Sequence, residues 1–249
     1  MEPLHFKGIF EKISPNIASL IAENLTIKDL INLGSSSQHL RAIFYEFKNS
    51  WQAIMKNWNL PESVVLELKT VEDCIVLLQK KLIKVENYFI KLNLEGKHWL
   101  IFPASDIFYD WKGSEYWPLH SHKESWFGET PIPHLINVCW FRMFGDFAIP
   151  RGKYSLNFRI CADENLNLHE SYFTLATENC AEFMIKFVFD SEVESNLKKT
   201  AGNFSILKLG EFDLTNCPEK EVKVSLRSKE GDDWWKSGFW LDAIIFIPI

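Results

Sequence analysis

The sequence predicts an α+β multidomain protein, in which a small helical module and a linker helix precede an antiparallel β-sandwich. Two observations predict this division. Apolar residues recur with the period of a helix as far as Phe89, whereas from Trp99 they alternate with the period of a strand. Most of the 10 Trp residues lie beyond position 98, and aromatic residues are enriched in strands. We place the helical module at 10–58, the linker at 59–92 and the sandwich at 93–249.

Three short helices are expected in the N-terminal module. Ser14 can cap the first helix and Pro15 suits its first turn, Thr26 can cap the second, and the third begins near Ser37. A module of about 45 residues has only a small core. It would therefore be stabilised by a partner that covers its exposed apolar face.

The linker is expected to form one long amphipathic helix from Val71 to Phe89. Its apolar residues recur at alternating spacings of four and three, with Lys80, Lys81 and Lys84 between them. Such a helix would act as a stiff spacer between the module and the sandwich.

The sandwich is expected from short segments of alternating apolar and polar residues that are separated by turn signals. Turns are expected at Pro150–Gly152 and Glu230–Asp233, and Trp235 is expected to pack at the start of the last strand. Two further segments are apolar on both faces, as central strands can be. The alternating segments are 154–160, 222–226 and 239–247, and the apolar ones are 136–144 and 183–189.

Composition and charge argue against several classes of function. The net charge of -6 and the interleaving of Lys/Arg with Asp/Glu disfavour nucleic-acid binding. The N-terminus lacks the basic and apolar runs of a secretory signal, and no segment approaches the roughly 20 apolar residues of a membrane span. The five cysteines form no C-x-x-C pair, so we expect free thiols and a cytoplasmic and/or nuclear location.

The sequence contains no arrangement that indicates an enzyme. It has no Gly-x-Ser-x-Gly nucleophile motif and no glycine-rich phosphate loop. His120 and His122 would share one face of a strand, but a metal site needs a third ligand nearby. We therefore expect no catalytic residue, no metal and no cofactor.

The helical module resembles the F-box, which docks on the adaptor subunit of cullin-RING (SCF) ubiquitin ligases. The resemblance rests on Ile13-Ser14-Pro15, Lys28-Asp29-Leu30, Leu40-Arg41 and Trp51. It departs from the family at Ser37-Gln38-His39, where Val is common. The resemblance implies an SCF adaptor as partner, although the same residues could instead form the module's own core. The implied adaptor-binding residues are Pro15, Ile21, Leu25, Leu30 and Leu33.

The C-terminal part resembles the phloem-lectin family (phloem protein two type), which also occurs fused to F-boxes. The resemblance implies a sandwich of jelly-roll type that binds N-acetylglucosamine-containing glycans. Its motifs occur in family order over nearly all of residues 98–249. They are Asp110-Trp111-Lys112-Gly113-Ser114-Glu115-Tyr116-Trp117, Leu135-Ile136-Asn137-Val138-Cys139-Trp140, Lys208-Leu209-Gly210-Glu211-Phe212 and Trp235-Lys236-Ser237-Gly238.

The same resemblance implies a carbohydrate-binding site at Trp111, Trp117, Glu221 and Glu230. A sugar presents an apolar C–H face that suits a flat indole ring, and hydroxyls that a carboxylate can orient. The sugar-contacting tryptophans of the family match Trp111 and Trp117, and one acidic position aligns with Glu221. Glu230 stands near a second acidic position, with one extra residue before Trp235.

Two functions remain open from the sequence. In the first, the chain is the substrate-recognition subunit of an SCF-type ligase and binds glycans or glycoproteins through the sandwich. In the second, it is an F-box receptor whose lectin-like domain binds a protein target without sugar, which the changed acidic position favours. Exposure of Trp111 and Trp117 in one pocket would favour the first function, and burial of either would favour the second.

Overall fold

The computed structural model describes Asp29, Asn32 and residues 82–249, with gaps at 86, 93–97, 111, 140, 169–170, 178–184 and 230–234. The chain divides into two compact units, Met1–His98 and Trp99–Ile249. Asp29 and Asn32 are helical and exposed. The predicted adaptor-binding residues lie outside the described part of the chain, so their role stays a prediction; they are Pro15, Ile21, Leu25, Leu30 and Leu33.

The end of the first unit is a β-hairpin, which corrects the predicted linker helix over residues 83–89. Strands β1 (Ile83–Val85) and β2 (Tyr88–Leu92) pair antiparallel, with Ile83 opposite Ile90. Apolar β-branched residues flank Lys84 in β1, which is the alternation of a strand, and Asn87 lies in the turn. The remainder of the predicted helix, residues 71–81, lies outside the described residues.

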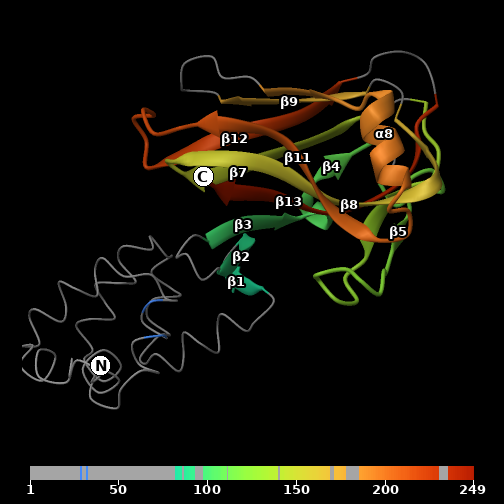
Figure 1. The fold of residues 1–249 in the computed structure, drawn as a ribbon, viewed down its shortest axis with the longest axis horizontal. Coiled ribbons are helices and arrows are strands. Elements are labelled where there is room, and N and C mark those ends of the chain that lie inside the picture. Colours follow the sequence, from blue (N-terminus) through green and yellow to red (C-terminus); the bar gives the residue numbers. More distant parts are fainter. Residues whose placement is uncertain are drawn as a thin grey trace, which may run out of the picture. The chain divides into compact units, whose positions relative to one another are not determined.

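The larger sheet of the second unit is built around β13 (Figure 1). One edge of β13 pairs with β8, which in turn pairs with β11, and the other edge pairs with β3 and β6. Strand β5 continues the sheet beyond β6. The strands are β3 (His98–Pro103), β5 (Leu119–His120), β6 (Ile132–Leu135), β8 (Lys153–Asn167), β11 (Phe204–Asp213) and β13 (Ser237–Pro248).

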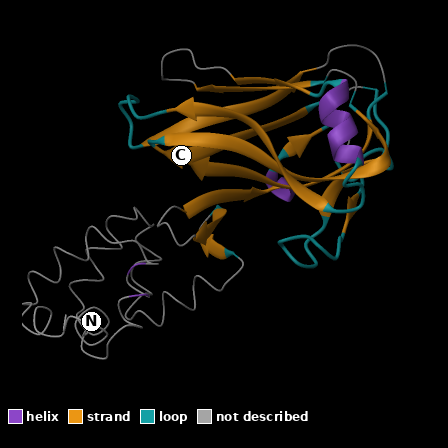
Figure 2. Ribbon diagram, in the orientation of Figure 1, coloured by secondary structure: helices purple, strands orange, loops and turns teal. Residues whose placement is uncertain are grey.

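The smaller sheet has the order β10-β9-β12-β7-β4, and its strands are also antiparallel. Figure 2 shows that strands dominate the unit, with helix α8 beside them. The bounds are β4 (Phe108–Tyr109), β7 (Met143–Pro150), β9 (Tyr172–Thr177), β10 (Ile185–Val188), β12 (Glu221–Lys229), the 3-10 helix η1 (Ala104–Asp106) and α8 (Ser191–Lys198). In the described residues, no helix has the length and hydropathy of a membrane span.

Aromatic side chains fill the space between the two sheets. The ring of Phe147 in β7 lies 4.7 Å from that of Phe102 in β3 and 5.5 Å from that of Phe246 in β13. Phe158 of β8 meets Phe173 of β9 at 4.9 Å. All five rings are buried, so the sheets pack face to face as a β-sandwich around an aromatic core.

Most of the predicted strands are confirmed, and one is wrong. Residues 154–160, 222–226 and 239–247 lie in β8, β12 and β13, and the described end of 183–189 contains β10. The apolar run 136–144 is not one strand, because β6 ends at Leu135 and β7 begins at Met143. These strands belong to different sheets, so the run is a crossover, and it is apolar because Val138 and Phe141 within it are buried.

The cysteines depart from the expectation of free thiols only. Cys139 and Cys161 carry thiols, and burial raises the pKa of the Cys161 thiol to about 11. Cys217, in contrast, is disulfide-bonded. Which cysteines pair cannot be inferred from their spacing in the sequence alone.

Candidate functional site

Trp117 anchors the loop between β4 and β5 in the core. It is 1% exposed, and its ring centroid lies 4.5 Å from that of Tyr109, 5.5 Å from Phe141 and 6.3 Å from Phe239. The indole therefore packs among other aromatic rings and presents no face on which a sugar could stack. Trp111, the other predicted stacking residue, lies outside the described residues.

The loop closes on itself above this anchor. The Gly113 amide donates to the Trp117 carbonyl at 3.0 Å, and Lys112 forms a bridge with Trp117. The Lys112 ammonium also donates to the Ser105 carbonyl. The backbone between residues 112 and 117 is thus held against η1 and the core, which fixes the direction of the side chains it carries.

Tyr116 points to solvent, because it stands next to the buried Trp117. It is 42% exposed, and its carbonyl accepts from the Ile136 amide at 3.1 Å. Val138, two residues after Ile136, exchanges backbone hydrogen bonds with Lys236 at 2.8 and 2.7 Å. Ile136 is 41% exposed and Trp235 is 53% exposed. Backbone hydrogen bonds thus connect the segments that carry Tyr116, Ile136 and Trp235, and we name these three exposed apolar side chains the loop-end cluster.

Trp235 is exposed, contrary to the prediction that it packs at the start of the last strand. Lys236 is fully buried instead, and its backbone is tied to Val138. The Trp235 carbonyl accepts from the Asn167 side chain at 3.0 Å. The pairing of β13 with β8 shifts register between Ser237 and Phe239, so simple alternation from the core residues of β13 does not predict the direction of Trp235.

Glu221 is not brought to the Trp117 loop. It is exposed at the start of β12, opposite Pro150 at the end of β7. The Trp117 loop follows β4, where Tyr109 is opposite Met143 at the start of β7. The seven-residue step from Met143 to Pro150 corresponds to about 23 Å. Glu230 lies outside the described residues, directly after the end of β12 that is nearer Met143.

The tyrosine and tryptophan of the anchor contain buried polar atoms without partners. Within the described part of the chain, neither the Tyr109 hydroxyl nor Trp117 Nε1 forms a hydrogen bond. Burial also raises the pKa of Tyr109. An unpaired buried polar atom costs about 1–3 kcal/mol, so this anchor is less stable than an all-apolar one would be.

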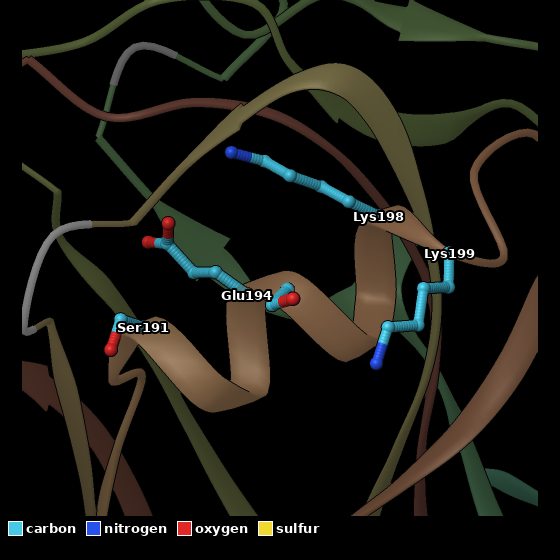
Figure 3. Close-up of a pocket in the computed structure, with 5 residues that line it drawn as sticks. Ser191, Glu194, Lys198 and Lys199 are labelled. Carbon is cyan, nitrogen blue, oxygen red and sulfur yellow. The ribbon is translucent and has the colours of Figure 1, made fainter.

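A separate pocket lies beside α8 (Figure 3). Its volume is about 500 Å³, and Glu194 on its wall also accepts the Leu168 amide at 2.6 Å. Among the described residues its lining is polar and contains no aromatic ring, so it offers no stacking surface for a sugar. The lining residues are Ser191, Glu194, Ser195, Lys198 and Lys199.

The loop-end cluster therefore stands out from the residues that the sequence singled out. From the sequence, Trp111 and Trp117 were predicted as site residues, whereas Tyr116, Ile136 and the exposure of Trp235 were not. The strand rule that neighbouring side chains point in opposite directions was the available signal for Tyr116. No comparable signal marks Ile136, which lies in an apolar run that reads as a buried strand.

The chain matches the model of a known protein family. A model of the family described as Phloem protein 2 matches residues 97–248. A search of curated proteins found no match.

Among solved structures, the chain is similar to a Podospora anserina GH26-CBM35 β-(1,4)-mannanase, with 10% identity and a TM-score of 0.36 over 61% of this chain and 28% of that chain. It is also similar to the C-terminal CBM6 of LamC, a marine laminarinase from Zobellia galactanivorans, with 10% identity and a TM-score of 0.36 over 60% of this chain and 98% of that chain. The chain thus spans less than a third of the length of the mannanase.

Proposed function

The chain belongs to the phloem protein 2 family, and on that premise we propose that its C-terminal unit is a lectin-like domain that binds carbohydrate. The observation that carries the proposal is the family match over residues 97–248, which includes every strand from β3 to β13. The exposed aromatic rings of the loop-end cluster support it, because flat apolar rings are the surfaces on which the C–H faces of sugars stack.

We assign the sugar to the loop-end cluster rather than to the indole of Trp117. Tyr116 and Trp235 offer exposed rings, and the exposed Asn137, whose backbone amide donates to the Tyr116 carbonyl, offers a side-chain amide for hydrogen bonds to hydroxyls. Trp117 serves this site as the buried anchor of the loop. Glu221 lies at the start of β12, opposite the far end of β7, and is not included.

The ligand class that we propose is N-acetylglucosamine-containing glycans or glycoproteins. The acetamido group of this sugar combines a methyl group with an amide, and the consecutive exposed residues Ile136 and Asn137 offer an apolar side chain and an amide. Trp111 and Glu230 belong to this proposal as additional contacts, since the first precedes Tyr116 in the same loop and the second precedes Trp235.

We further propose that the whole chain is a substrate-recognition subunit of an SCF-type ubiquitin ligase. This role rests on the F-box resemblance of residues 10–58, with an adaptor bound at Pro15, Ile21, Leu25, Leu30 and Leu33. Other subunits would transfer ubiquitin, so the chain itself would catalyse nothing and need no cofactor. The chain would then act in the cytoplasm and/or nucleus.

The alternative is an F-box receptor whose lectin-like domain binds a protein target without sugar. One observation favours it: the burial of Trp117 at 1% exposure removes one of the two predicted stacking rings. The loop-end cluster would then be a contact surface for a protein, because exposed apolar side chains that gather on loops also mark protein interfaces.

Calorimetric titration of the full chain with chitotriose tests the carbohydrate proposal. We expect saturable binding with a dissociation constant on the order of millimolar to micromolar. Trp235→Ala should weaken it by about tenfold or more, as the loss of one stacked ring predicts. The matched control is Ile249→Ala, because Ile249 is similarly exposed, at 50%, but follows the end of β13 that is far from Trp235. If the folded wild-type chain bound no chitotriose at millimolar concentration, the carbohydrate proposal would be wrong and the protein-target function would remain.

A further inference from the structure

A second group of aromatic and polar side chains lies on the outer face of the larger sheet. Trp240 of β13 is opposite His134 of β6 on one side and opposite Cys161 of β8 on the other. Residues opposite one another across antiparallel strands share a face of the sheet, as do residues two apart along a strand. Asp163 follows Cys161 by two and therefore joins Trp240 and His134 on this face.

The carboxylate of Asp163 fixes the orientation of both rings. Its Oδ1 accepts from Trp240 Nε1 at 3.1 Å, and its Oδ2 lies 2.7 Å from His134 Nε2. The His134 ring stacks on Trp240 with a centroid distance of 3.9 Å and an interplanar angle of 10°. The two rings are thus held in place before any ligand arrives, which lowers the entropic cost of binding.

His120 of β5 completes the group. It is exposed, and its ring centroid lies 6.1 Å from that of Trp240 and 6.3 Å from that of His134. Trp240, His134 and Asp163 are each only partly buried. We name His120, His134, Asp163 and Trp240 the sheet platform.

A buried ion pair fastens the loop that borders the sheet platform. Arg159 pairs with Asp242, and its guanidinium lies 4.5 Å from the Trp126 ring centroid and 4.2 Å from that of Phe204. Asp242 also accepts from the Ser125 hydroxyl at 2.7 Å and from the Trp126 amide at 3.1 Å.

The fastened loop places one further imidazole beside the platform. His122 lies at 5.2 Å from Trp240, and its Nδ1 accepts from the Glu124 amide at 3.2 Å. An imidazole that accepts at Nδ1 carries its proton on Nε2 when neutral, so His122 offers a donor to a ligand. The loop at the border of the platform is therefore held in place by an ion pair and hydrogen bonds.

The chemistry of the platform selects a neutral polyhydroxylated ligand. In the described part of the chain, His134 Nδ1 and both nitrogens of His120 form no hydrogen bond, and each Asp163 oxygen retains a lone pair. These groups include donors and acceptors, which suits vicinal hydroxyls. The carboxylate disfavours an anion, and within the described ranges no three His, Cys, Asp or Glu side chains are grouped to hold a metal ion.

We propose that the sheet platform is a second saccharide-binding site, separate from the loop-end cluster, with the sugar's C–H face on the rings of His120 and Trp240. This inference goes beyond the proposed function, because it makes one domain bivalent. Two weak sites on one domain would raise the apparent affinity for a long or branched glycan that can span both.

The test follows the Trp240 indole and His134 imidazole signals of the full chain by NMR during titration with chitotriose and with cellotriose. The titration is repeated in Tyr116→Ala/Trp235→Ala, which removes the rings of the loop-end cluster. We expect at least one trisaccharide to shift the platform signals saturably, with a dissociation constant on the order of millimolar, and the shifts to persist in the double variant.

Two platform variants complete the design. His120→Ala removes an exposed ring and should weaken the platform response by about tenfold. Asp163→Asn keeps the shape but loses the charged acceptor, and should weaken it as well. The control Ile249→Ala should leave the platform response unchanged, because Ile249 follows the far end of β13.

Each outcome separates the two proposals. Platform shifts that survive in the double variant support the second site even if the loop-end cluster binds nothing. Shifts that vanish with the loop-end rings, or platform signals that do not move while calorimetry records binding, overturn the second site and leave the proposed function intact. An unchanged response in folded His120→Ala and Asp163→Asn would also overturn it.

Discussion

The Tyr109 hydroxyl destabilises the core in which the Tyr109 ring is packed. Its hydroxyl is buried against Trp117 and, in the described part of the chain, has no hydrogen-bond partner. Removing an unsatisfied buried polar group is favourable, because the group gave up its bonds to water on folding and gained nothing in return. Tyr109→Phe should therefore raise the free energy of unfolding by about 1–2 kcal/mol, measured by urea denaturation.

Tyr154→Phe is the matched control for this change. The Tyr154 hydroxyl donates to the Pro150 carbonyl at 2.9 Å, so its removal breaks a bond that exists. We expect a loss of about 1 kcal/mol. If Tyr109→Phe were equally destabilising, the Tyr109 hydroxyl would have to make a bond that the structure does not contain.

At the scale of the element, β13 depends on Gly238. Its φ is +82°, and a Cβ at this position would lie 2.6 Å from the Leu166 backbone nitrogen. The clash is with backbone of the neighbouring strand β8, which cannot move aside as a side-chain tip could. Gly238→Ala should therefore cost more than about 2 kcal/mol of unfolding free energy and lower the thermal midpoint.

Gly202→Ala separates the two causes of that cost. Gly202 has a similar φ of +80°, but an added Cβ would meet nothing within 4 Å. Only the backbone preference is lost there, which is worth about 1 kcal/mol. Equal losses for the two variants would show that the close approach of β13 to β8 contributes nothing.

The elements differ in how well the sequence predicts them. Alternation identified residues 154–160, 222–226 and 239–247 as strands, because one face of each is in the core. Two kinds of element escaped. The apolar residues of 71–89 have the spacing of a helix. In the last part of this range, residues 83–89, the same residues also fit the β1–β2 hairpin that the structure contains. The crossover 136–144 is apolar because it passes between sheets, and composition does not distinguish that from a central strand.

The candidate site was predictable only where local rules apply. Loop residues 111–117 drew attention through their tryptophans, but whether an indole stacks on a ligand or anchors a loop depends on what packs against it. Tyr109, Phe141 and Phe239 bury Trp117, and the last two come from later parts of the chain that no local pattern connects with the loop. Alternation through β13 would bury Trp235 with Phe239, but the pairing of β13 with β8 shifts register between Ser237 and Phe239, which no local pattern contains.

For the whole molecule, the disulfide at Cys217 links stability to the redox state of the surroundings. A disulfide typically contributes about 2–4 kcal/mol, mostly by restricting the unfolded chain. We expect Cys217→Ser to lower the unfolding free energy by about this amount under oxidising conditions, and reduced wild-type protein to match the variant. Urea denaturation with and without dithiothreitol measures both.

Cys139→Ser is the control, because Cys139 carries a thiol in the structure. Its stability should depend on dithiothreitol as the wild type does. The comparison bears on location as well, since a reducing cytoplasm or nucleus would keep Cys217 reduced and the chain at its lower stability. A wild-type protein indifferent to dithiothreitol would mean that the bond contributes nothing to folding.

The division into units Met1–His98 and Trp99–Ile249 predicts that the two proposed functions can be removed one at a time. Leu30→Asp places a charge among the proposed adaptor-binding residues, where an apolar interface would have to bury it without a partner. We expect it to abolish capture of the full chain by an immobilised SCF adaptor and to leave chitotriose affinity within about twofold. Trp235→Ala should weaken chitotriose binding by about tenfold or more and leave capture by the adaptor unchanged. Circular dichroism checks that both variants are folded. Loss of both activities in either folded variant would contradict the separation, and wild-type protein that the adaptor does not capture would remove the ligase role while leaving the lectin role to its own test.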